Sequence, residues 1–110
     1  MTFGDCLRQL REQQSLRQGD LARGAGVSDV YVCDIEKGNR KPPDIEKLRT
    51  WVAMLNPSPE EAAQLYDLYG AARNTIAPDL VDYLISNSSA RDAIRRIIGQ
   101  QVEYDWDMIP

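Results

Sequence analysis

Side chains suited to catalysis or metal binding are scarce in this chain. The 110 residues include no histidine and two cysteines, Cys6 and Cys33. Zinc sites need several cysteine or histidine ligands at close spacing, so we expect no metal site. The sequence also shows no pairing of a nucleophile with a base and no phosphate-cradling loop. We therefore expect neither an enzyme nor a bound cofactor, and we interpret both cysteines as small core residues.

The charged side chains are divided unequally along the chain. The net charge is −4, but residues 1–55 carry +1 and residues 56–110 carry −5. Within the first half the positive charge is locally clustered, as at Arg40-Lys41. This asymmetry indicates that the two halves have different functions.

The elements that position these charges are predicted to be helices, because apolar residues recur at helical spacing. Phe3, Cys6, Leu7 and Leu10 form the first such stripe. Strand alternation and hairpin turn signals are absent from the sequence. Residues that favour helix ends bound the stripes, with Ser28 and Ser58-Pro59 at starts and Gly26 at an end. The predicted helices cover about residues 2–14, 18–26, 28–38, 44–56, 58–73, 78–84 and 88–99, the last capped by Ser88 or Ser89.

We therefore expect an all-α fold with two parts. Residues 1–73 form a five-helix domain, and residues 74–110 form a two-helix C-terminal extension with a short tail. The stripe Ile94, Ile97 and Ile98 is either core or the seam of a dimer, and the neighbouring arginines either form a solvated face or pair with a partner's acids. The acidic and aromatic tail, 103–110, either orders on contact with a partner or folds back on the last helices.

Only Gly26-Val27 separates the second and third helical patterns, which is the tight turn of a helix-turn-helix. The sequence around it resembles the Xre family of phage-repressor-like helix-turn-helix regulators, over about residues 3–55. The residues that carry the resemblance are Leu16-Arg17-Gln18, Leu21-Ala22, Gly26-Val27-Ser28, Val32, Ile35-Glu36-Lys37-Gly38 and Arg40-Lys41-Pro42. Their order and spacing together are specific, although each piece alone is weak.

This resemblance implies a repressor-like bundle in which helix 28–37 enters the major groove of duplex DNA. It implies that Gln18 contacts a phosphate, that Asp29, Val30 and Asp34 read base edges, and that Ser28 and Tyr31 touch phosphates. The loop of Lys37, Asn39, Arg40 and Lys41 is expected to grip the DNA backbone or to probe the minor groove. The full predicted interface is Arg17, Gln18, Ser28, Asp29, Val30, Tyr31, Asp34, Lys37, Asn39, Arg40 and Lys41. Glu36 is expected to be a buried structural partner.

Three features depart from the family pattern. Arg17 stands where the family has a capping threonine, so Ser15 is expected to cap the second helix with Gln18 completing a capping box. Gly19 weakens the start of that helix. Asp29 and Asp34 make the reading face acidic, which predicts either readout of cytosine amino groups or weak binding that depends on dimerisation.

Taken together, these features predict a sequence-specific DNA-binding transcriptional regulator that acts as a repressor and forms a homodimer. The alternative is a protein-interaction module on the same scaffold, an antitoxin or anti-repressor, in which the acidic C-terminal half holds a protein partner. The sequence contains no apolar run long enough for a membrane span and no secretory leader pattern, so we expect a cytoplasmic protein.

Overall fold

The computed structural model describes residues 1–99 of the chain, and within this range it confirms the all-α fold. The helices are α1 (Phe3–Gln13), α2 (Gln18–Ala25), α3 (Asp29–Glu36), α4 (Ile45–Leu55), α5 (Pro59–Ala72), α6 (Pro78–Ser86) and α7 (Ser88–Gly99). In the described range, no helix has the length and apolar character needed to cross a bilayer. The tail at 103–110 lies outside the described residues.

The helices begin where local side chains satisfy free backbone N–H groups. The hydroxyl of Thr2 accepts from Asp5 N, while the Asp5 carboxylate accepts from Thr2 N, which forms a capping box. Ser58 and Glu61 form the same reciprocal pair at the start of α5. Because both members of each pair lie within one turn of the chain, the sequence alone predicts where these helices start.

Two predicted caps are wrong. Ser15 does not cap α2: its φ of 56° places it in the turn after α1, and Arg17 occupies the N-cap position. There the Asp20 carboxylate accepts a hydrogen bond from Arg17 N at 2.7 Å, so the acid inside the helix replaces the expected hydroxyl cap. At the start of α7, Asn87 Oδ1 accepts from Ala90 N at 2.9 Å, so Asn87 takes the role expected of Ser88 or Ser89.

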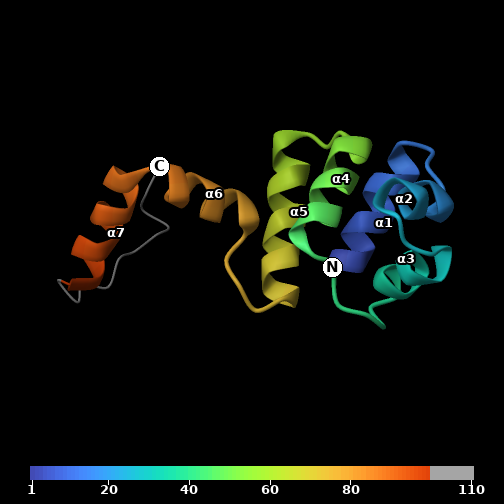
Figure 1. The fold of residues 1–110 in the computed structure, drawn as a ribbon, viewed down its shortest axis with the longest axis horizontal. Coiled ribbons are helices and arrows are strands. Elements are labelled where there is room, and N and C mark those ends of the chain that lie inside the picture. Colours follow the sequence, from blue (N-terminus) through green and yellow to red (C-terminus); the bar gives the residue numbers. More distant parts are fainter. Residues whose placement is uncertain (100–110) are drawn as a thin grey trace. The chain divides into compact units, whose positions relative to one another are not determined.

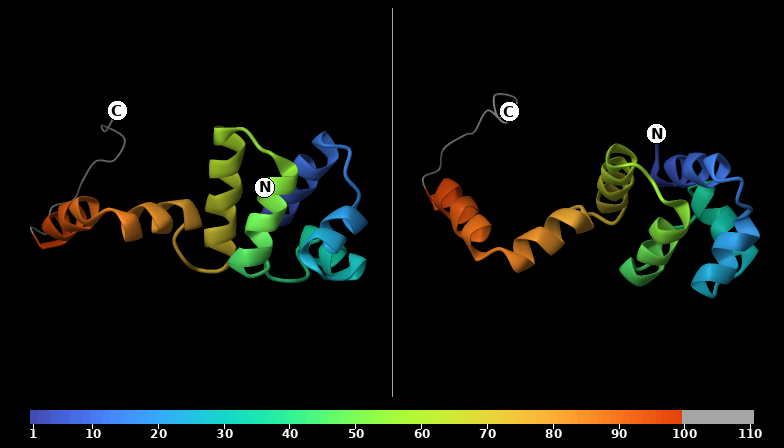
Figure 2. Two further views of the ribbon diagram at one scale, coloured as in Figure 1. Left: turned by 45° about the horizontal axis from the view of Figure 1, so that its top comes forward. Right: turned by 90° about the horizontal axis from the view of Figure 1, so that it is seen from above.

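The chain divides into two compact units, one ending at Asp79 and one beginning at Leu80. In the first unit, α2 and α3 lie side by side at one end and α5 lies at the other (Figures 1 and 2). One core cluster joins the first five helices; it consists of Phe3, Cys6, Leu7, Leu10, Leu21, Ala22, Val32, Ile35, Leu48, Trp51, Leu55, Leu65 and Tyr69. Cys33 is half-buried and outside this cluster, so the prediction of a core residue holds for Cys6 alone. The expected domain boundary at residue 73 stays a prediction.

One buried hydrogen bond and one close backbone approach fix the helices that carry the helix-turn-helix. Trp51 is completely buried, and its indole Nε1–H donates to the Leu21 carbonyl at 2.8 Å, which ties α4 to α2. Gly4 lies directly against the end of α3, because a Cβ on Gly4 would come within 2.6 Å of the Glu36 carbonyl oxygen. Helices α2 and α3 are therefore held by α1 and α4 in one orientation.

The second unit is described by itself. The side chain of Arg91 donates to the carbonyls of Leu84 and Ile85 at 2.6 and 2.7 Å, so it satisfies the C-terminal end of α6. Arg95 instead makes an exposed pair with Asp92 at 3.7 Å. Every residue of α7 is at least partly exposed, including Ile94 and Ile98. The described part of this unit thus leaves an apolar stripe without a partner inside its own fold.

Candidate nucleic-acid interface

Helices α2 and α3 meet at a tight left-handed turn. Gly26 has a φ of 69°, a conformation that glycine adopts without steric cost. Val27 N then donates to the Ala22 carbonyl at 2.9 Å, and Ser28 Oγ accepts from Tyr31 N at 3.1 Å to start α3. The predicted turn and the predicted Ser28 cap are both confirmed, and they fix the angle between the two helices.

Helix α3 presents one buried face and one outer face. Val32 and Ile35 are completely or almost completely buried in the core, as the sequence pattern predicts. On the opposite side Asp29 is exposed and Val30 is 68% exposed, while Asp34 is half-buried. These are the three predicted base-reading residues, and the structure brings them onto one surface of the helix.

Cys33 belongs to this outer face and was missed by the sequence reasoning. It follows Val30 by three residues and Asp29 by four, so helical geometry places the three side chains together. Its thiol is half-buried and makes no disulfide. The same spacing rule could have identified Cys33, but its apolar character favoured a core position instead.

The basic loop follows α3 directly. Gly38 turns the chain with a φ of 80°, and Asn39 N donates to the Asp34 carbonyl at 2.9 Å. The Arg40 guanidinium lies 4.8 Å from the centre of the Tyr31 ring, a cation–π contact between the loop and α3. The four predicted loop residues, Lys37, Asn39, Arg40 and Lys41, are all exposed beside the end of α3.

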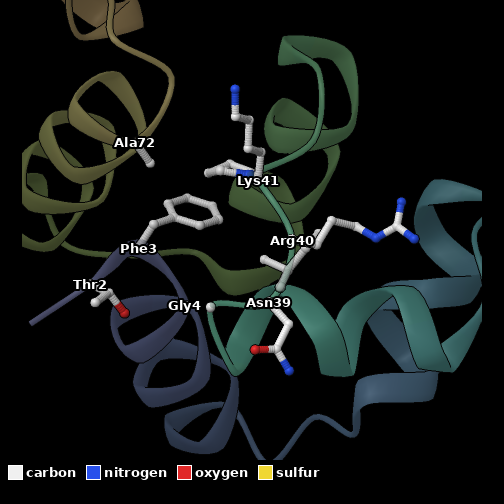
Figure 3. Close-up of a pocket in the computed structure, with 10 residues that line it drawn as sticks. Thr2, Phe3, Gly4, Asn39, Arg40, Lys41 and Ala72 are labelled. Carbon is white, nitrogen blue, oxygen red and sulfur yellow. The ribbon is translucent and has the colours of Figure 1, made fainter.

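The far end of this loop is anchored to α5. The Tyr69 hydroxyl donates to the Pro43 carbonyl at 2.6 Å, and Arg73 Nη1 donates to the Pro42 carbonyl at 2.8 Å. Between the loop and the start of α1 lies a pocket of about 370 Å³ that includes Phe3 (Figure 3). Arg40 extends away from Phe3 in this view, so its charge is not directed into the pocket (Figure 3).

Gln18 is held by a buried ion pair. Arg11 Nε and Nη2 donate to the two carboxylate oxygens of Glu36 at 2.7 and 2.9 Å, and Gln18 Nε2 donates to Glu36 Oε1 at 3.0 Å. Glu36 is 6% exposed, which confirms its expected structural role. The hydrogen bond with Glu36 raises the pKa of Arg11 above the ordinary arginine value. The network joins α1, α2 and α3 and fixes one end of the Gln18 amide.

Sequence reasoning missed Arg11, the partner that makes burial of Glu36 tolerable. An unpaired buried carboxylate is costly, whereas a two-pronged guanidinium satisfies both of its oxygens. Arg11 Nη1 also donates to the Leu16 carbonyl at 3.0 Å, so it braces the link between α1 and α2. The sequence indicates only that a buried Glu36 needs a cationic partner; it does not identify Arg11 as that partner.

The start of α2 lies close to the Asp29 side chain. A Cβ on Gly19 would lie 3.4 Å from Asp29 Oδ2 and also 3.4 Å from Arg23 Nη1, so both side chains lie beside this glycine, while Arg23 Nη2 pairs with Asp20. The Asp29 carboxylate is therefore turned toward α2. Arg17, predicted to be in the interface, is exposed at the N-cap of the same helix.

The arrangement brings together groups suited to recognition. Within residues 1–99, no three His, Cys, Asp or Glu side chains form a group able to hold a metal ion. What the structure gathers instead is an exposed helix face, a neighbouring loop of cations and a glutamine fixed at a helix start. Such a combination can bind a polyanion and distinguish among groups on its surface.

Comparison with known proteins gives the family of this chain. A helix-turn-helix domain family matches residues 2–78. The HTH-type transcriptional regulator DdrOP3 of Deinococcus deserti is 27% identical over 106 residues, which cover 96% of this chain and 75% of that protein. No solved structure shows a significant match. The chain belongs to the helix-turn-helix domain family, the class of DNA-binding regulators that its Xre-like motif predicts.

Proposed function

We propose that the protein is a sequence-specific DNA-binding transcriptional regulator that inserts α3 into the major groove. The observation that carries the proposal is the outer face of α3, which stays exposed beside the loop of Lys37, Arg40 and Lys41. A recognition helix contributes base contacts from its first turns, while neighbouring cations contact phosphates. The exposed first turn and the adjacent cationic loop together support this division of roles.

Several side chains are proposed to contact the phosphates. Gln18 has a second amide hydrogen beyond the one that Glu36 accepts, and the start of α2 supplies free backbone N–H groups. Arg17, Ser28 and Tyr31 complete the set on the α2–α3 surface, and Asn39 belongs to the loop. The cation–π contact holds Arg40 close to Tyr31, which lowers the entropy lost when both contact the backbone.

We further propose that the protein acts as a homodimer whose contact is made by the second unit. Leu80, Tyr83, Ile94 and Ile98 are 52%, 60%, 40% and 69% exposed in that unit. Apolar stripes of this kind are stabilised when a second copy covers them. A two-fold dimer would then bind two half-sites about one helical turn apart. Light scattering should give twice the chain mass, and Ile94→Asp with Ile98→Asp should give the monomer mass.

The experiment that tests DNA binding is selection from a randomised duplex library, followed by fluorescence anisotropy with the selected duplex. Each phosphate contact by a cation adds about 0.9 to the slope of log K against log salt. Arg40→Ala with Lys41→Ala should weaken binding to every sequence and reduce the slope by about 2. The matched control, Arg95→Ala with Arg96→Ala, removes the same charge from α7. Once light scattering shows that this variant keeps the dimer mass, it should leave the slope unchanged.

The proposed direction of control is repression in the cytoplasm, because a bound regulator can block a promoter by occupancy alone. A reporter whose promoter contains the selected site should lose expression when the protein is present. A rise in expression would contradict repression while leaving DNA binding intact.

One observation favours the alternative of an antitoxin or anti-repressor. Helix α3 contains Asp29 and Asp34 on its outer side and no lysine or arginine within its bounds. A carboxylate that meets a phosphate is repelled, whereas a basic protein surface would attract it. If the library yields no enriched duplex and the protein instead copurifies with one tightly bound protein, this alternative replaces the regulator.

A further inference from the structure

The first turn of α3 exposes an aliphatic side chain where a polar one would be expected. Val30 is 68% exposed, two residues after the Ser28 cap. A single exposed apolar residue is common on protein surfaces. On a helix surface, however, valine has a lower helix propensity than alanine, lysine or glutamate, because its branched Cβ restricts the side chain. No burial within the first unit compensates for this choice.

The neighbours of Val30 on the outer side of α3 lie beside it or are half-buried. The Asp29 carboxylate lies beside Gly19 on α2. Cys33 and Asp34 follow one turn later on the same side, and both are half-buried. A ligand that approaches the beginning of α3 therefore meets the two methyl groups of Val30, with the exposed Asp29 carboxylate on the side of α2.

In duplex DNA the group that matches an aliphatic side chain is the C5-methyl of thymine, which lies in the major groove. Valine has no hydrogen-bonding atom in its side chain, so it cannot satisfy the donors and acceptors that the other base edges present. We infer that Val30 recognises a thymine methyl group, so that each bound half-site contains a thymine at the position facing Val30. This inference rests on the proposed function.

The test uses the full chain and the duplex selected from the library. Each thymine is replaced in turn by deoxyuridine, which removes the methyl group and keeps the pairing. Burial of one methyl group corresponds to about a fourfold change in affinity. We expect one thymine per half-site at which this replacement weakens binding by about that factor, measured by fluorescence anisotropy.

Val30→Ala identifies the residue responsible. This variant should bind the thymine and deoxyuridine duplexes with equal affinity at that position, and it should fold normally because Val30 is exposed. Ile76→Ala, which shortens another exposed aliphatic side chain, should keep the fourfold difference. Val30→Thr retains one methyl group and should keep part of the fourfold difference in affinity.

The failures of the two proposals can be told apart. If the selected duplex binds tightly but no thymine responds, or if Val30→Ala responds as strongly as the unmodified protein, the thymine inference is wrong and DNA binding stands. If no duplex is selected at all, the proposed function and this inference are both overturned.

Discussion

Replacing Glu36 by alanine should destabilise the first unit severely. The side chain of Glu36 is 3% exposed and that of Arg11 is 12% exposed, so the substitution leaves a guanidinium in a nearly dry site without its counter-ion. It also removes the acceptor of the Gln18 amide. Removing one partner of a buried pair costs about 3–5 kcal/mol, because the remaining charge is uncompensated.

Urea unfolding followed by the fluorescence of buried Trp51 measures this loss, with Trp106→Phe in every variant so that Trp51 is the single tryptophan. With a slope of about 1–3 kcal/mol per M for a small domain, the midpoint should fall by at least about 1 M. Lys47→Ala is the control, because its pair with Asp44 is more exposed; it should cost much less than Glu36→Ala.

The paired replacement Arg11→Met with Glu36→Leu separates a lost pair from lost packing. Apolar side chains of similar size often restore the stability that a buried pair provides. The double variant should therefore recover most of the midpoint that Glu36→Ala loses. The reasoning is refuted if Glu36→Ala costs no more than Lys47→Ala, or if the double variant is as unstable as the sum of its single variants.

Three further predictions concern other parts of the first unit. Gly4→Ala should destabilise the first unit, because the new methyl group would overlap the Glu36 carbonyl. Gly19→Ala should instead stabilise it by up to about 1 kcal/mol, because alanine has the higher helix propensity. Thermal unfolding of the two variants measures both effects. Hydrogen bonds from Thr2 lower the pKa of Asp5, and those from Ser58 lower the pKa of Glu61. Because these pKa values lie below their unfolded values, the stabilisation is present above about pH 4.5 and is lost as pH falls through the folded pKa. Urea unfolding at a series of pH values measures this effect. In the double variant Asp5→Asn with Glu61→Gln, the free energy of unfolding should fall less steeply below about pH 4. A fall as steep as in the unmodified protein would contradict the prediction. Burial raises the pKa of the Cys6 thiol, so iodoacetamide should modify Cys33 first. Peptide mass spectrometry should then show that the selected duplex protects Cys33. Equal modification rates at the two thiols would contradict the buried position of Cys6 and the half-buried position of Cys33.

The sequence predicts the helices well because their boundaries depend on nearby residues. Ser28, Asp44 and Ser58 each cap a helix through a backbone N–H three residues later, so the signal lies within one turn of the chain. Asn87 was missed because two serines with the same capping ability follow it. Ser15 was wrongly chosen because it lies in a left-handed turn after α1, directly before Leu16, which packs against the core; spacing alone does not reveal that turn.

The interface was less accessible to sequence reasoning than the fold. Spacing places Asp29, Val30 and Asp34 on the outer side of α3, and the structure agrees. The contact of Arg11 with Glu36 joins residues 25 positions apart, and the approach of Asp29 to Gly19 depends on the angle between α2 and α3. Such contacts arise only when helices pack, so no local pattern identifies them.

The most direct test of the account is an amide NMR titration of the full chain with the selected duplex. If α3 enters the major groove, the largest shift changes should occur at residues 28–41 and at the start of α2, while the exposed face of α5 stays unchanged. Shift changes confined to residues 80–99, with 28–41 unaffected, would contradict it.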